Sequence, residues 1–381
     1  MNDTTITITR LLTDKLALNH SRIDARSIPL SLARGEALLK ISRVAITTNN
    51  ITYAAFGEAM QYWGFFPTSD DAWGHMPVWG FADVVASTVS GVEAGERFYG
   101  YFPIASHLRV APERVTARGF YDGAEHRRLL TSAYNQYTRC SQDPAHASER
   151  ENHQMIVRPL FITSFMLADF LQDNGYFGAR QLVVSSASSK TAYGTAFCLQ
   201  AHRDLELIAL TSGRNREFVE RLGCYRQAVT YDALDSIRRD VPTLYVDFSG
   251  DEALRGRVHH HFGDALFYDC FAGSAQNTNF LRDTGLPGPA PKFYFAPVQI
   301  MKRNADWGHT VVNQKFNAAQ HAFVERIRDR ANPWMKIVET SGFEAVPALI
   351  EALHAGRTDP SEGHVVVLDR RSAAASASLL R

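Results

Sequence analysis

A turn rich in hydroxyl groups follows a short apolar stretch near the middle of the chain. The letters QLVVS at 181–185 predict a short buried strand, and the turn SSASSKTAYG spans 185–194. A strand that ends in a tight turn opening a helix can bind phosphate, because the helix N-terminus presents unpaired backbone N–H groups. Such turns usually carry glycines that let the backbone approach a pyrophosphate. Here serines, Lys190 and Thr191 take their places, and only Gly194 remains.

Two interpretations of this turn stay open. In the first, the hydroxyls of Ser188, Ser189 and Thr191 and the ammonium of Lys190 hold a phosphate together with the helix N-terminus. In the second, the turn has lost nucleotide binding, and its serines and lysine serve other chemistry. A serine here also caps the helix under either interpretation. The excess of serines beside Lys-Thr favours phosphate, whereas a Walker loop is disfavoured because its glycines are missing.

The end of the next predicted strand also bears on the ligand. LELIAL at 205–210 is followed by Thr-Ser-Gly-Arg, and no acidic residue occurs before Glu217. A site for NAD would place an acidic side chain here to bind the ribose hydroxyls. Ser212 and Arg214 suit a ribose 2′-phosphate instead, because a guanidinium pairs with phosphate oxygens through a planar fork. The alternative is a helix capped by Ser212 with a solvated arginine.

Other catalytic and metal-binding patterns are weak or missing. No G-x-S-x-G motif of the serine hydrolases occurs. Three consecutive histidines at 259–261 fall in a predicted helix, where neighbouring side chains point in different directions and cannot share one metal. The cysteines form no C-x-x-C pair, which argues against a disulfide framework or a structural zinc site and favours a reducing cytoplasm. They are Cys140, Cys198, Cys224 and Cys270.

The elements that must position these residues change character along the chain. The first third predicts short strands separated by glycine and proline turns, which favours a small barrel or sandwich. From about residue 158, helices and strands alternate, which predicts a parallel, doubly wound sheet with ligands at the carboxyl ends of its strands. Near the end, Val346, Leu349, Ile350 and Leu353 have the spacing of an amphipathic helix.

The chain therefore predicts two domains in an α/β fold. A β-rich domain comprises 1–157 and 302–381, and a parallel-sheet domain comprises 158–301. Within the first, 118–155 is polar and predicts a long surface excursion that borders the active site and shapes substrate choice. The Ala/Ser-rich end, 372–381, is expected to fray.

This order of parts resembles the medium-chain dehydrogenase/reductase superfamily, on its zinc-free quinone and enoyl reductase side. Three stretches carry the resemblance: GEALLKISRVAITTNNITYAAFGE at 35–58, PVWGFADVVASTVSGVEAGERFYGYF at 77–102 and FEAVPALIEALHAGRTDPSEGHVVVL at 343–368. It covers nearly the whole chain except 118–155, and the serine-rich turn indicates an uncharacterised, DUF2855-like branch. The resemblance implies a GroES-like β-rich barrel domain and a Rossmann-like domain that binds NADP.

Zinc members of that superfamily have a cysteine at the position of Thr47 and a His-Glu pair at those of Trp79 and Gly80. Because catalytic zinc needs about three nitrogen, sulfur or oxygen ligands, we expect a metal-free site. The resemblance places Asn50, Tyr53 and Thr163 at the cleft where the substrate and the nicotinamide meet.

The side chains expected to perform the chemistry are mainly phenols. A tyrosine can protonate an enolate, and an asparagine or threonine can hydrogen-bond a carbonyl. Any one tyrosine can equally be a packing residue. The candidates are Tyr53, Asn50, Tyr134 and Tyr137 for catalysis, with Ser188, Ser189, Lys190, Thr191, Ser212, Arg214 and Thr163 for the cofactor.

The balance of charge limits the possible partners. Lys plus Arg and Asp plus Glu are 40 each, so the formal net charge is zero. A protein that coats nucleic acid or a membrane surface needs a cationic surplus, so neither partner is expected. No apolar run in the sequence predicts a membrane-spanning segment. A small-molecule substrate is expected, and a homodimer is the candidate assembly.

Three functions follow from these patterns. The leading hypothesis is a zinc-independent, NADPH-dependent reductase of an activated alkene, enone or quinone. The second is a non-redox enzyme on the same fold, such as a lyase or retro-aldol catalyst that uses Lys190 or the tyrosines. The third is a non-catalytic protein that binds NADP.

Overall fold

The computed structural model describes residues 5–202, 204–273 and 285–368 of the 381-residue chain. Its residues form two compact units. The β-rich unit comprises 1–156, 337–358 and 362–381, and the parallel-sheet unit comprises 157–336 and 359–361. The boundary at 156 falls within helix α2 (Glu151–Asp173).

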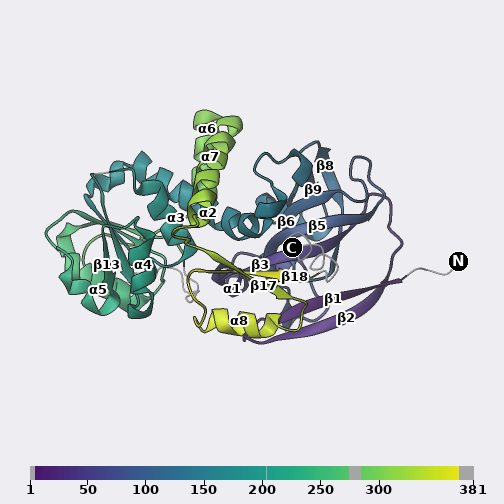
Figure 1. The fold of residues 1–381 in the computed structure, drawn as a ribbon, viewed down its shortest axis with the longest axis horizontal. Helices are drawn as coiled ribbons and strands as arrows, with labels where there is room; N and C mark the ends of the chain where they lie inside the picture. Colours follow the sequence, from purple (N-terminus) through teal and green to yellow (C-terminus); the bar gives the residue numbers. More distant parts are fainter. Residues whose placement is uncertain (1–4, 203, 274–284, 369–381) are drawn as a thin grey trace. The chain divides into compact units, whose positions relative to one another are not determined.

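The β-rich unit contains a nine-stranded sheet in the order β17-β18-β3-β5-β6-β10-β9-β8, with β7 also paired to β3. A smaller sheet, β2-β1-β4, includes the long antiparallel pair β1 and β2, which lie side by side in Figure 1. The strands are β1 (Thr5–Asp14), β2 (Ser21–Pro29), β3 (Ala37–Ile46), β4 (Trp73–Gly74), β5 (Pro77–Ser87), β6 (Arg97–Pro103), β7 (His107–Val110), β8 (Pro112–Thr116), β9 (Gly119–Asp122), β10 (Gln136–Arg139), β17 (Lys336–Ser341) and β18 (Glu362–Val367).

Apolar side chains on both faces explain why β3 is central to this sheet. Eight of its ten residues, ALLKISRVAI, are buried, as expected for a strand covered on both sides. The predicted C-terminal helix is α8 (Val346–His354), and it buries Val346, Ile350 and Leu353 in the same core. Helix α1 (Thr48–Ala55) follows β3 directly.

Residues 118–155 differ from the predicted surface excursion. Strands β9 and β10 pair with each other, and β10 continues the nine-stranded sheet through β6. The remainder is largely short 3₁₀ turns. The polar composition concealed these strands because each has only four residues and its buried aromatic side chains come from one face.

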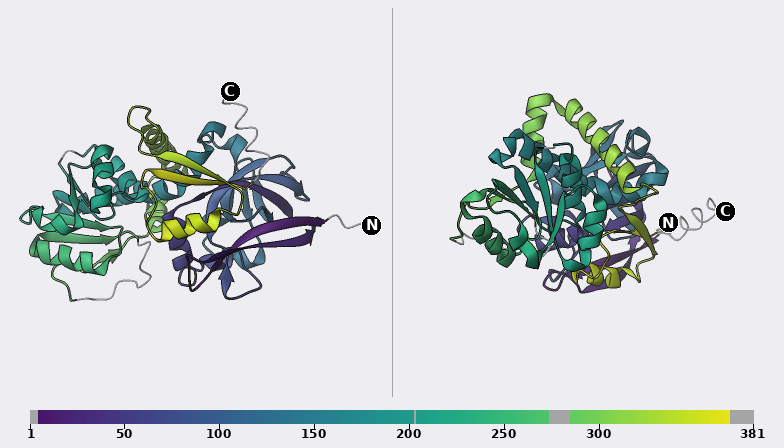
Figure 2. Two further views of the ribbon diagram at one scale, coloured as in Figure 1. Left: turned by 60° about the horizontal axis from the view of Figure 1, so that its bottom comes forward. Right: turned by 60° about the vertical axis from the view of Figure 1, so that its left-hand side comes forward.

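The parallel-sheet unit has the strand order β13-β12-β11-β14-β15-β16. The order reverses between β11 and β14, so right-handed crossovers place helices on both faces, as Figures 1 and 2 show. Ligands of such sheets bind at the carboxyl ends of the strands beside this reversal. The strands are β11 (Gln181–Val184), β12 (Glu206–Thr211), β13 (Gln227–Thr230), β14 (Thr243–Asp247), β15 (Leu266–Phe271) and β16 (Lys292–Phe293).

The predicted domain boundary at 302 falls inside one helix of this unit, α6 (Ala296–Trp307), and places the next helix, α7 (His309–Ile327), in the first domain. Residues 302–336 belong to the parallel-sheet unit, because aromatic side chains of α7 pack on α2: the rings of Phe161 and Phe323 stack 4.5 Å apart. Figure 1 shows α6 and α7 side by side. The helices are α3 (Lys190–Leu199), α4 (Arg216–Leu222), α5 (Glu252–Phe262), α6 (Ala296–Trp307) and α7 (His309–Ile327).

One helix is more apolar than the sequence analysis indicated. Among the described residues, the helical stretch 148–173 is long and apolar enough to cross a membrane by length and composition alone. However, 61% of its most apolar window is buried inside the fold. A core helix passes the same test, and the burial favours that interpretation. The predicted frayed end, 372–381, lies outside the described residues.

Candidate functional site

The serine-rich turn connects β11 to α3 at the carboxyl edge of the parallel sheet. Ser186 adopts a left-handed backbone conformation with φ of 46°. That conformation favours glycine, so a serine here keeps the shape of a glycine turn at some cost in strain. Ser189 caps α3, since its hydroxyl accepts the backbone N–H of Ala192 at 3.3 Å. The turn therefore keeps the strand–turn–helix form expected of a phosphate site.

Neighbouring loops hold the turn through polar side chains. Asn215, after the second strand of the unit, donates from its amide to the Ser188 hydroxyl at 3.0 Å. The backbone N–H of Ser186 donates to the phenol oxygen of Tyr231 at 3.2 Å, and the hydroxyl of Tyr225 donates to the Ala187 carbonyl at 3.2 Å. These loop residues were missed in the sequence because they lie 27 or more positions away from the turn residues that they contact.

The two predicted cations of this region face a short segment at 359–361. Lys190 donates from Nζ to the Pro360 carbonyl at 3.3 Å. Hydrogen bonds from Ser361 lower the pKa of the Asp359 carboxyl, and the positive charges of Arg221 and Arg214 lower it further. Arg214 is exposed. Lys190 thus lies beside Pro360, and an acidic side chain lies near Arg214.

The region has unpaired polar groups that suit a dinucleotide. Thr211 Oγ1 and Asn215 Oδ1 are buried and have no hydrogen-bond partner; Thr211 ends β12, and Asn215 lies in the loop that follows it. Buried polar atoms are costly unless paired. A ribose hydroxyl or a phosphate would pair them, while Lys190, Ser188 and the first turn of α3 would hold a pyrophosphate. The residues present therefore fit NADP.

On α2, the residue that contacts the turn is Ser164, next to the predicted Thr163. Thr163 is half-buried on α2, and no contact with the turn supports its predicted role. The next residue, Ser164, is fully buried and donates its hydroxyl to the Thr191 carbonyl at 2.8 Å. Consecutive helical residues point about 100° apart, so only one of them can face α3. A Cβ on Gly194 would lie 2.7 Å from Ser164 Oγ, which explains the remaining glycine.

A second group of candidates gathers in the β-rich unit. Tyr53 lies on α1, Tyr62 begins the 3₁₀ helix η1 (Tyr62–Phe65), and Tyr134 lies in η3 (Ser132–Asn135). The phenol oxygens of Tyr62 and Tyr134 are 3.2 Å apart, and the Trp79 indole donates to the Tyr53 hydroxyl at 3.3 Å. We call Tyr53, Tyr62, Tyr134 and Trp79 the phenol cluster.

Burial sets the protonation of this cluster. It raises the pKa of Tyr53 to about 12, with a further contribution from Tyr62. It also raises the pKa of Tyr62, and it raises that of Tyr134 well above the ordinary value. All three phenols therefore carry their protons at neutral pH and can act as hydrogen-bond donors or acids.

The structure gives two predicted catalytic residues a different role. Asn50 is 3% exposed, and its amide is used on both sides: Oδ1 accepts the Thr47 N–H, and Nδ2 donates to the Pro77 carbonyl. It caps α1 and ties it to β5. Tyr137 is fully buried and donates to the Tyr101 carbonyl at 2.8 Å. These bonds favour structural roles for Asn50 and Tyr137 over the predicted catalytic ones.

Tyr62 was missed in the sequence analysis. It joins Tyr134 across 72 positions of the chain, so no local spacing links them. The only signal was the aromatic stretch YWGFF at 62–66.

Thr47, Trp79 and Gly80 stand at the positions where zinc members of the superfamily carry their metal ligands. Trp79 packs on Tyr99 with ring centroids 5.4 Å apart, and a Cβ on Gly80 would lie 2.3 Å from the Arg43 carbonyl oxygen. Thr47 caps α1. These positions serve packing and capping.

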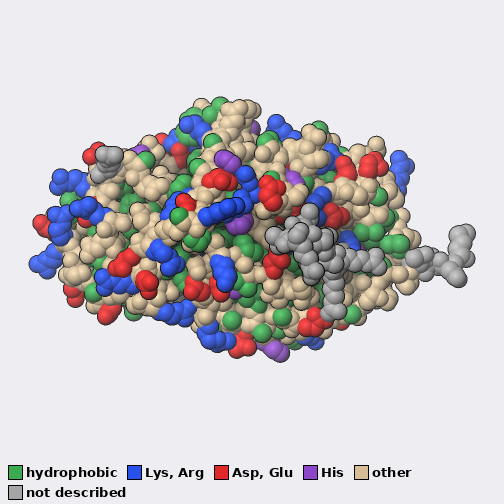
Figure 3. Space-filling view, in the orientation of Figure 1, with side chains coloured by type: hydrophobic (Ala, Val, Ile, Leu, Met, Phe, Trp, Pro, Cys, Tyr) green, Lys and Arg blue, Asp and Glu red, His purple; other side chains and the backbone are tan. Residues whose placement is uncertain are grey.

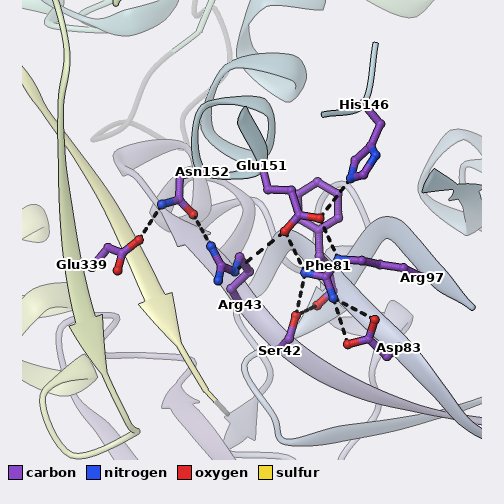
Figure 4. Close-up of polar contacts among 9 residues, drawn as sticks. All are labelled: Ser42, Arg43, Phe81, Asp83, Arg97, His146, Glu151, Asn152 and Glu339. Atoms are coloured by element: carbon purple, nitrogen blue, oxygen red, sulfur yellow. Dashed lines mark hydrogen bonds and ion pairs between the residues drawn. The ribbon is translucent and has the colours of Figure 1, made fainter. Parts of the chain in front are cut away.

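Among the described residues, one other cluster has the donor types of a metal site. Atoms of Cys140, His146 and Glu151 lie within 4.8 Å of one another. However, Arg97 binds both oxygens of Glu151, at 2.6 and 2.8 Å, and Arg43 lies 3.9 Å away. Figure 4 shows these guanidinium groups facing the carboxylate. A cation here would meet two positive charges, so the cluster is better described as a buried ion-pair network.

Chelation should therefore leave the protein intact. We expect activity to survive dialysis against a strong chelator and elemental analysis of the washed protein to find no stoichiometric zinc. The expectation rests on the side chains at 47, 79 and 80 and on the arginines around Glu151. Zinc at one equivalent per chain after washing would contradict it.

The side chains of the three consecutive histidines point in different directions, as helix geometry requires. His259 contacts Asp269 and the Pro287 carbonyl, His260 contacts the Gly256 carbonyl, and His261 contacts the Ile237 carbonyl. Each ring thus has its own partner. On the face seen in Figure 3, acidic and basic side chains are interspersed, with no extended cationic stripe.

Comparisons with known proteins place this fold. A family model described as a protein of unknown function (DUF2855) matches residues 44–359. Protein CurA from Vibrio vulnificus, solved with NADPH, is similar with a TM-score of 0.59 at 13% identity, over 95% of this chain and 99% of that one. The yhdH oxidoreductase from Salmonella enterica, solved with NADP, has a TM-score of 0.53 at 13% identity, over 96% and 100%.

A third similar structure contains crotonyl-CoA as well as NADP. The Etr1p complex with NADP and crotonyl-CoA has a TM-score of 0.52 at 12% identity, over 95% of this chain and 100% of that one. No protein of curated function matches the sequence significantly. At these identities the likeness establishes the fold alone, and it confirms the predicted α/β architecture of a GroES-like and a Rossmann-like domain.

Proposed function

We propose that this chain, which belongs to the DUF2855 family of proteins of unknown function, is an NADPH-dependent, zinc-independent reductase of an activated alkene, enone or quinone. The full-length likeness to structures that contain NADP(H) supports this proposal. The observation that supports it most strongly is that one chain contains both of two features. One is a hydroxyl-rich, cationic turn at a parallel-sheet edge, and the other is a cluster of protonated phenols.

The turn residues would hold the cofactor. Lys190, Ser188 and the N-terminus of α3 would bind the pyrophosphate, and Ser212 and Arg214 the adenosine 2′-phosphate. The orphaned Thr211 Oγ1 and Asn215 Oδ1 would pair with ribose or phosphate. When bound, NADPH supplies a hydride to the electron-poor β-carbon of the substrate.

The phenol cluster would complete the reaction. Tyr134, which is half-buried, would donate its proton to the α-carbon of the resulting enolate, and Tyr62 would hydrogen-bond the phenolate left behind. Tyr53, held by the Trp79 indole, would donate to the substrate carbonyl oxygen. One hydride and one proton thus add across the double bond.

The non-redox alternative has less support. A Schiff-base lysine needs a neutral amine, usually produced by an apolar environment or another cation. Lys190 instead donates from Nζ to the Pro360 carbonyl, so part of its hydrogen-bonding capacity is already used. A panel of enones and quinones mixed with NADPH separates the hypotheses: a reductase consumes the NADPH absorbance, a lyase yields product without that change, and a binding protein does neither.

Cofactor preference depends on Arg214. We expect Arg214→Ala to weaken NADPH binding by roughly tenfold, because it removes one charge-assisted hydrogen bond from an exposed site. The affinity for NADH should hardly change, since NADH lacks the 2′-phosphate. Calorimetric titration with both nucleotides measures the difference, and Arg216→Ala, two positions along, is the matched control. Equal affinities of the wild type for NADPH and NADH would refute the 2′-phosphate assignment.

A further inference from the structure

Two side-chain bridges join the adjacent strands β11 and β14. At their amino ends, Gln181 donates from its amide to Thr243 Oγ1 at 2.9 Å. At their carboxyl ends, Ser185 donates its hydroxyl to Asp247 Oδ1 at 2.8 Å. The strands run parallel with Gln181 opposite Thr243. The two bridges are therefore both buried but lie at opposite ends of the strands.

The carboxyl-end bridge is the more elaborate. Asp247 is fully buried, and its Oδ1 also accepts the Ser249 hydroxyl at 2.7 Å and the N–H groups of Ser249 and Gly250 at 2.8 and 3.1 Å. Its other oxygen pairs with Arg255 at 2.7 Å. The Ser185 hydroxyl in turn accepts the Phe248 N–H at 2.9 Å. One carboxylate thus organises the ends of both strands that flank the reversal of strand order.

The same network extends to the loop after β15. Arg255 lies 3.8 Å from Asp269, which contacts His259 at 2.8 Å. The other ring nitrogen of His259 lies 2.7 Å from the Pro287 carbonyl. The side chains that link Ser185 to Pro287 are at most 8% exposed. Water cannot compete for these bonds, so their geometry is well determined.

We propose that Asp247 is a positioning residue for the phosphate-binding turn. It acts through Ser185, the residue directly before Ser186 with its left-handed backbone. Where other nucleotide-binding turns use glycines, this chain would hold a serine-rich backbone in shape through a buried carboxylate. The inference rests on the proposed function, because it assumes that the turn binds a dinucleotide phosphate.

The two bridges provide a matched experiment. Ser185→Ala removes the carboxyl-end bridge and Thr243→Val the amino-end one. Both variants should lower the melting temperature, but only Ser185→Ala should weaken NADPH binding, by roughly tenfold. It should also speed amide hydrogen exchange at 186–190, with or without nucleotide. Ser249→Ala removes one of several donors to Asp247, so it is a milder variant with a smaller loss of affinity in the same direction.

The outcomes separate this inference from the proposed function. If the wild type binds NADPH and Ser185→Ala and Ser249→Ala bind it equally well, the positioning role is wrong and the reductase proposal stands. If Thr243→Val weakens binding as much as Ser185→Ala, the effect is general destabilisation and the inference also fails. A wild type that does not bind NADPH overturns both proposals.

Discussion

Replacing Tyr134 by phenylalanine is expected to lower kcat by about a hundredfold and to leave the affinity for NADPH unchanged. The estimate is the low end of what a positioned general acid contributes. Burial raises the pKa of Tyr134 well above its ordinary value, so the phenol is protonated throughout the neutral range and the loss should not depend on pH there. Steady-state kinetics on the best enone or quinone of the panel measures it.

Two further tyrosines make this test specific. Tyr137→Phe removes a phenol that the sequence analysis had also nominated, but this one is bonded to the Tyr101 carbonyl inside the core. It should lower stability and leave kcat near the wild-type value. Tyr62→Phe should reduce kcat less than Tyr134→Phe does, because Tyr62 acts on Tyr134 rather than on the substrate. A fully active Tyr134→Phe enzyme would remove Tyr134 from the mechanism.

Removing Glu151 should destabilise the β-rich unit by about 3 kcal/mol, the low end of the usual cost of breaking a buried ion pair, because Arg97 keeps its two bonds to Asp83. Its carboxylate binds Arg97 through both oxygens, lies near Arg43 and also contacts His146 at 3.0 Å (Figure 4). In Glu151→Ala the two guanidinium groups would face each other across the gap. Urea unfolding followed by tryptophan fluorescence measures the change in the free energy of unfolding.

A neighbouring acidic residue is the control. Glu149 lies two positions earlier, is 68% exposed and meets Arg150 only at 3.9 Å. Glu149→Ala should change stability by less than about 0.5 kcal/mol, as exposed ion pairs usually do. Similar decreases in the free energy of unfolding in the two variants would mean that the buried ion pairs of Glu151 stabilise the fold no more than an exposed ion pair does.

The same carboxylate should make stability depend on pH. Burial alone would raise the pKa of Glu151, but the bonds and charge of Arg97 outweigh it and hold the pKa below the ordinary 4.5. A lowered pKa means that the stabilisation is fully present above pH 4.5 and is lost as the pH falls through the folded value. Wild type should therefore lose more stability on acidification than Glu151→Gln, and parallel curves would contradict this.

Several features were predicted from the sequence because they depend on local order. Short strands between glycine and proline turns, the spacing of Val346, Ile350 and Leu353, and the alternation of helices and strands reflect the geometry of single elements. The serine-rich turn was found for the same reason, since strand, turn and helix are consecutive. The family resemblance then supplied the architecture, and the fold confirms it.

The tertiary structure decided which side chains meet. Tyr62 reaches Tyr134 across 72 positions and Ser185 reaches Asp247 across 62, so no periodicity within one element could pair them. Burial likewise separated Tyr134 from Tyr137, although they lie three residues apart. Element type follows from neighbours in sequence, whereas hydrogen-bond partners and exposure follow from the pairing of distant strands. The sequence alone therefore determined where the turn and the tyrosines lie along the chain, and only the fold decided which side chains they contact.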